Sequence, residues 1–144
     1  MNKYQLINDW LKNYEPLLDV WIDFNAVNNS EEGAVSLNSV PSERIIAKYI
    51  DGTTRREVLF MVAMMKFYDS GTSLTNMENL QEVENFAEWI ETNKSLLNFG
   101  DNSTIEAVDV LTNYPELAGV DTDNSIAKYQ FQVRITYQTT KEEK

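Results

Sequence analysis

The sequence predicts an α+β fold, in which an N-terminal helix and one central amphipathic helix pack on a mixed, mainly antiparallel β-sheet. Three segments predict it. Apolar and polar residues alternate along Ala127–Gln138, two apolar runs flank Asp51-Gly52, and Leu80–Ile90 carries an apolar stripe at helical spacing. A strand as rich in aromatic and β-branched residues as Ala127–Gln138 needs paired neighbours and a cover for its apolar face. The remaining segments are expected to supply them.

Composition excludes several classes of function. The 144 residues carry a formal charge of −11 and contain neither cysteine nor histidine, which removes disulfides, thiolate chemistry and the usual ligands of zinc and copper. The negative charge opposes binding to phosphate backbones and anionic lipids. Polar residues interrupt Met1–Tyr14, and no run approaches the ~20 apolar residues of a membrane span. We expect a soluble protein with no cofactor, no membrane contact and no tight nucleic-acid binding.

The N-terminal region is expected to form a helix and then a strand. Aromatic and aliphatic residues recur at helical spacing over Asn2–Asn13, and Pro16 disfavours helix at the residue before it. This stripe is more consistent with a core-facing helix than with a partner groove. Alternation over Leu18–Phe24 predicts a short strand.

A polar stretch follows, over Asn25–Pro41. It predicts either a long hairpin or a mobile loop that becomes ordered against a partner, and an exposed loop without a role has equal weight. If the loop does contact a partner, its tip residues Asn29, Glu31 and Glu32 are the candidate contacts.

The second strong signal is a hairpin. Apolar runs at Ile45–Ile50 and Val58–Phe67 flank Asp51-Gly52, a dipeptide that tolerates the positive φ of tight turns. Val58–Met65 is apolar throughout, which predicts a central strand covered on both faces, with a buried helix segment as the alternative.

The second half is expected to contain a helix and two strands. A Ser/Thr-x-x-Glu pattern at Thr75–Glu78 predicts the start of the central helix, and its glutamates are typical of a solvated face rather than of a metal site. Thr104–Thr112 predicts a strand, and a turn-rich connection is expected over 114–124. We expect one domain over 1–138 and a frayed tail over 139–144.

Catalytic patterns are lacking. Serine and threonine have no histidine to activate them, no glycine-rich phosphate or nucleotide motif occurs, and Asp121–Asn124 lacks the glycine and glutamate of an EF-hand loop. Paired carboxylates of a hydrolase are the only feasible alternative, and nothing singles out two of the many acids. We expect no enzyme, and no catalytic, cofactor-binding or metal-binding residue.

Four segments in order resemble a family of small proteins of long-tailed bacteriophages, the minor capsid or tail terminator proteins. The likeness extends over about Leu18–Gln138 and rests on Lys48–Thr53, Glu84–Ile90, Ala127–Gln130 and Arg134–Tyr137. The resemblance implies a structural protein of the head–tail neck, present in the virion and assembled in the bacterial cytoplasm. Such proteins form a ring, usually of six copies, that caps the tail tube and meets the head connector.

A ring of this kind constrains where charges lie. Because each copy is acidic, contacts between copies need compensating cations, and Arg44, Lys48, Arg55 and Arg56 near the hairpin are the candidates. Arg55 and Arg56 are otherwise typical of a solvated pair, since nothing around them resembles a phosphate clamp. The remaining negative charge would let DNA slide through the ring. The competing hypothesis is an acidic module that mimics DNA and sequesters a basic host protein.

Overall fold

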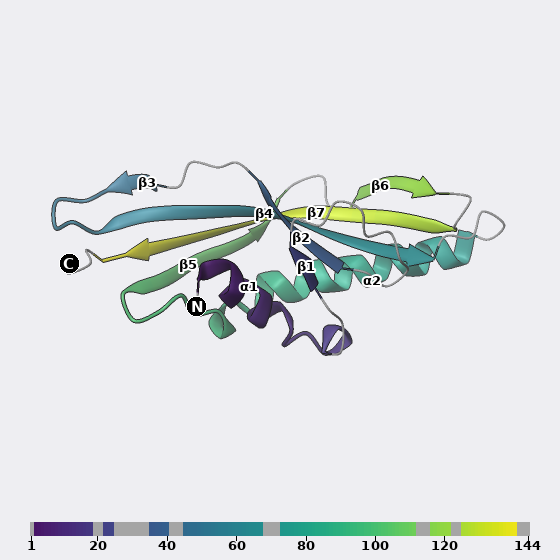
Figure 1. The fold of residues 1–144 in the computed structure, drawn as a ribbon, viewed down its shortest axis with the longest axis horizontal. Coiled ribbons are helices and arrows are strands. Elements are labelled where there is room, and N and C mark those ends of the chain that lie inside the picture. The colour runs from purple at the N-terminus through teal and green to yellow at the C-terminus, as the bar shows by residue number, and fades with distance from the viewer. Residues whose placement is uncertain are drawn as a thin grey trace.

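The computed structural model describes residues 2–18, 22–24, 35–40, 45–67, 73–111, 116–121 and 125–140, and shows the predicted α+β fold (Figure 1). In chain order the elements are α1 (Lys3–Leu11), a 3₁₀ turn (Glu15–Leu17), β1 (Ile22–Phe24), β2 (Val35–Val40), β3 (Ile45–Lys48), β4 (Thr54–Phe67), α2 (Ser73–Thr92), a second 3₁₀ turn (Lys94–Leu96), β5 (Ser103–Val110), β6 (Glu116–Asp121) and β7 (Ile126–Thr139).

Two long strands form the centre of the sheet. The strand order is β1-β2-β4-β7-β5, and β4 and β7 pair antiparallel over 14 residues each, from Thr54 opposite Thr139 to Phe67 opposite Ile126. Two short strands pair with parts of the central strands that β2 and β5 leave unpaired. β3 pairs with the start of β4, and β6 pairs with the start of β7. The predicted alternation of β7 is confirmed, because Tyr129, Phe131 and Val133 are all buried.

Both helices lie on one side of the sheet, with α2 running beneath β4 and β7 (Figure 1). Helix α1 begins with a reciprocal capping box, in which the Asn2 side chain accepts from the Gln5 amide and the Gln5 side chain accepts from the Asn2 amide, at 2.9 and 2.8 Å. Trp10 is buried and donates from Nε1 to the Asn93 carbonyl at 3.0 Å. This bond ties α1 to the end of α2.

An aromatic cluster joins the two layers. Phe86 of α2 is fully buried, stacks on Tyr14 at 4.8 Å between ring centroids, and meets Phe131 of β7 edge-on at 6.0 Å. Val83, Ala87 and Ile90 of the same stripe are also buried. The stripe therefore covers β7 at Phe131, as predicted, whereas Leu80 at its predicted start is 37% exposed.

Three details concern the predicted connections. First, β1 and β2 pair parallel, with Ile22 opposite Val35, so these strands are not the arms of the hairpin that was one alternative for Asn25–Pro41; the intervening residues 25–34 lie outside the described ranges. Second, part of the expected turn region is strand β6, which uses the edge of β7 that β5 leaves free. Third, Thr139 belongs to β7 and pairs with Thr54 and Ser103, so the expected frayed tail does not include it.

Helix α2 also begins two residues earlier than the capping pattern predicts, at Ser73. Thr75 consequently lies inside the first turn, where its hydroxyl is not at the N-cap position.

The prediction that β4 is covered on both faces is wrong as well. Val58, Phe60 and Val62 point into the core, but Leu59 and Met61 on the opposite face remain partly exposed. The helices account for this difference, because both pack on the Phe60 side. A run of apolar residues therefore marks a strand in the middle of a sheet without requiring a second covering layer.

Candidate interaction surface

The structure places three of the seven predicted contact residues, and all three lie at one end of the sheet. Lys48 ends β3, and Arg55 and Arg56 begin β4. The other four, Asn29, Glu31, Glu32 and Arg44, are outside the described residues. The hairpin is thus the part of the predicted surface that lies within the described residues.

The β3–β4 hairpin extends past both helices at one end of the molecule (Figure 1). Its turn is closed by hydrogen bonds from the Tyr49 amide to the Thr53 carbonyl at 2.9 Å and from the Gly52 amide to the Tyr49 carbonyl at 3.0 Å. The Asp51 carboxylate accepts from the Thr53 amide at 2.9 Å, which lowers the pKa of that carboxyl. The hairpin tip, residues Tyr49 to Gly52, therefore has a defined shape.

The hairpin tip presents apolar side chains to water. Ile50 has a relative exposure of 108%, and Tyr49 of 45%. Folding of a single copy does not bury this side chain, so Ile50 adds no hydrophobic free energy to the stability of the fold. Apolar groups in such positions mark sites of contact with other molecules when they occur together.

Gly52 adopts φ +92°, a left-handed conformation that β-branched residues avoid. We expect Gly52→Val to lower the free energy of unfolding by about 1–2 kcal/mol, measured by urea titration. Gly52→Asn is the matched control, because asparagine tolerates positive φ and should lose clearly less. Equal losses in the two variants would contradict the turn geometry.

An ion pair fixes the base of the hairpin. Arg55 Nε donates to Glu106 Oε1 of β5 at 2.7 Å, Gln138 of β7 donates to the other oxygen, and Lys94 Nζ donates to the Glu106 carbonyl at 2.8 Å. The hydrogen bond from Arg55 holds the pKa of the Glu106 carboxyl below its usual range. Arg55 therefore already has an acidic partner in its own chain, and only the exposed part of its guanidinium is open to a neighbour.

This ion pair predicts a pH dependence. Because the folded pKa of Glu106 is lowered, its contribution to stability is complete above the unfolded value near 4.5 and disappears as pH falls through the folded pKa. We expect Glu106→Gln to be less stable than the parent at neutral pH, with a difference that shrinks below about pH 4.5. Thermal unfolding at a series of pH values measures it, and a difference that grows on acidification would contradict the assignment.

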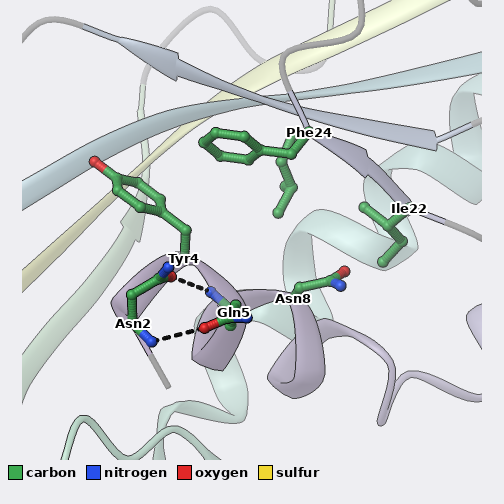
Figure 2. Close-up of a pocket in the computed structure, with 7 residues that line it drawn as sticks. Asn2, Tyr4, Gln5, Asn8, Ile22 and Phe24 are labelled. Carbon is green, nitrogen blue, oxygen red and sulfur yellow. Dashed lines mark hydrogen bonds between the residues drawn. The ribbon is translucent and has the colours of Figure 1, made fainter.

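A second feature lies beside the edge strand β1, between α1 and β1. A cavity of about 250 Å³ is lined by Asn2, Tyr4, Gln5, Asn8, Ile22, Phe24 and Leu37 (Figure 2). The Tyr4 and Phe24 rings stand 5.1 Å apart between centroids, and Phe24 is 46% exposed. Asn8 Oδ1 is buried without a hydrogen-bond partner in the described part of the chain. We call this the α1–β1 cavity.

The outward face of α2 is acidic. Glu78, Glu84 and Glu88 are exposed, and Glu82 forms an ion pair with Lys66 of β4 at 3.2 Å. Glu91 has a structural role, since its carboxylate accepts from the Val110 amide at 3.1 Å where β5 ends. Over the residues that the structure describes, no cluster of three or more acids, histidines or cysteines has the geometry to hold a metal.

The sequence indicated the turn at Asp51-Gly52 but gave no weight to the apolar side chain before it. Ile50 was only the last residue of the apolar run Ile45–Ile50, and its exposure depends on how far the hairpin extends past the neighbouring elements. The α1–β1 cavity could not be found from sequence. It lies between α1 and strands that meet only through the parallel pairing of β1 with β2, and that pairing was not predicted.

Comparison with protein-family models and with curated proteins finds no match to this chain. Among the described residues, no helix has the length and apolar character needed to cross a bilayer.

Proposed function

We propose that this protein is a structural component of the head–tail neck of a long-tailed bacteriophage. It caps the tail tube, ends tube growth and joins the tube to the head connector. It acts as a ring, of six copies if it follows the proteins that it resembles. Its partners are other copies of itself, the tube protein and the connector protein.

The observation that carries the proposal is the projecting β3–β4 hairpin with its exposed tip. Ile50 is fully exposed in a hydrogen-bonded turn, as suits a protein that completes its apolar contacts only in an assembly. The same hairpin contains Lys48–Thr53, one of the segments on which the resemblance rests. The α+β fold is of the kind that the resemblance implies.

Charge supports passage of DNA through such a ring. Six copies would carry a formal charge of −66, six times −11. The exposed glutamates of α2 would repel phosphate if they faced the lumen, so that DNA moves through without adhering.

The test is electron microscopy of tails assembled by a phage from which this gene has been deleted. Overlong tubes without heads are the expected result, and supplying the protein from a plasmid should restore complete particles. Normal, infectious particles in the deletion would exclude the terminator role.

The acidic face of α2 favours one alternative, a module that mimics DNA and sequesters a basic host protein. Glu84 and Glu88 lie one turn apart on the exposed side of the helix, and no described basic residue pairs with either. Reversing both charges to lysine would abolish capture of a DNA-binding protein under this alternative. Under the tail-terminator proposal the same variant would still cap the tube, because the contacts of the ring are made through the hairpin.

A further inference from the structure

Two apolar features of the described chain are left uncovered by it. One is the hairpin tip, where Ile50 is fully exposed and Tyr49 is half exposed. The other is the α1–β1 cavity, whose aromatic wall includes the half-exposed Phe24. They lie at different places on the surface, the tip at the end of β3 and β4, and the cavity beside β1 (Figures 1 and 2). A tip therefore cannot enter the cavity of its own copy without rebuilding the sheet.

We infer that the hairpin tip of one copy inserts Ile50 into the α1–β1 cavity of a second copy. This contact rests on the ring of the proposed function and specifies how neighbouring copies meet. The sizes agree, since a cavity of about 150 Å³ lined by aliphatic and aromatic groups admits a benzene ring, and the α1–β1 cavity has about 250 Å³. An isoleucine side chain fits with room for part of the Tyr49 ring.

One pair of opposite charges would meet across this contact. All the residues that line the cavity are uncharged, and the nearby Lys3 has its Nζ 5.5 Å from the centroid of the ring of Tyr4, a lining residue. Asp51 follows Ile50 at the hairpin tip and would approach Lys3 when Ile50 enters the cavity. In a chain of charge −11, a contact that places an acid against a base is one of the few that copies can make without repulsion.

The tip and the cavity are different patches, and in a ring this contact would be heterologous. Each copy would offer its tip to one neighbour and its cavity to another, and such contacts close into a ring when the rotation per copy divides a full turn. A twofold dimer could make the same contact twice, with each tip in the cavity of the other copy, so a ring requires association beyond two copies.

Disulfide trapping tests the contact directly, since the chain has no cysteine of its own. Ile50→Cys protein is mixed with Phe24→Cys protein under mild oxidation at millimolar concentration, and intact mass identifies each disulfide-linked pair. The control mixture contains Ile50→Cys and Glu88→Cys, because Glu88 is exposed on α2 and does not line the cavity. We expect the tip–cavity heterodimer to exceed the control heterodimer severalfold.

Two outcomes would overturn the inference. Pairs of Ile50→Cys with itself in excess over the heterodimer would show that tips meet tips. A heterodimer no more abundant than the control would show that another occupant, such as a segment of the tube protein, fills the cavity.

A substitution gives an independent measurement. Ile50→Ser should weaken self-association at least about tenfold, as expected for loss of one buried aliphatic side chain, and should leave the melting temperature unchanged because Ile50 is exposed. Met77→Ser is the matched control, since Met77 is 63% exposed on α2. Sedimentation equilibrium compares the three proteins, and equal association constants for Ile50→Ser and the parent would contradict the contact.

The two proposals can fail separately. Normal particles in the gene deletion, together with a strong tip–cavity disulfide, would exclude the tail role and retain the self-contact. Overlong tubes together with a negative trapping result would do the opposite.

Discussion

Phe86→Ala is expected to lower the free energy of unfolding by about 3–5 kcal/mol, the range found for truncation of buried aromatic residues. Phe86 is fully buried and touches the rings of Tyr14 and Phe131, so its removal opens a space among three elements that cannot all move inward. Partial collapse would bring the value to the lower end of the range. Urea unfolding followed by tryptophan fluorescence and by circular dichroism measures the change.

Leu96→Ala is the control for this prediction, because it also shortens an apolar side chain but at a position that is 54% exposed. Its effect should stay within about 0.5 kcal/mol. If the loss for Phe86→Ala were no larger than that for Leu96→Ala, the aromatic cluster would not be the junction between helix and sheet.

Val133→Lys is expected to prevent folding altogether. Val133 is completely buried at the middle of β7, opposite Phe60 of β4 and Val110 of β5. A lysine there would bury an unpaired charge, which costs several kcal/mol, against a total stability of about 5–15 kcal/mol for most domains. Loss of the far-ultraviolet circular dichroism signal, or accumulation of the protein in the insoluble fraction, would register this result.

The adjacent residue supplies a matched control. Gln132 points to the opposite face of the same strand and is partly exposed. Gln132→Lys should fold with stability within about 0.5 kcal/mol of the parent. If Val133→Lys folded as well as Gln132→Lys, Val133 would not face the core.

Elements with strong local patterns could be predicted from the sequence. The alternation of β7 and the Asp51-Gly52 turn are local patterns, and both appear in the structure. The predicted Leu80–Ile90 stripe is buried at Val83, Phe86, Ala87 and Ile90, whereas Leu80 is exposed. What could not be predicted depends on pairing between distant segments. The parallel contact of β1 with β2 and the strand β6 are examples, because strand partners and edges are set by tertiary packing.

The candidate site was predictable only in part, for the same reason. The basic residues near the hairpin included Arg55, but its ion pair with Glu106 requires β5 to lie beside β7, and Glu106 falls at the shift in register between Ile105 and Ala107. Exposure of Ile50 and the presence of the α1–β1 cavity likewise follow from the arrangement of whole elements.

The central position of β7 has a consequence for synthesis. This strand follows every other described strand in the chain, yet it supplies partners for β4, β5 and β6. Until it emerges from the ribosome, at about 5–20 residues per second, β4 lacks its long partner and Phe86 lacks one of its contacts. Contacts between segments so far apart in sequence also form slowly. The nascent chain therefore holds an incomplete sheet with exposed apolar edges, which suits it to protection by a chaperone until its last strand is added.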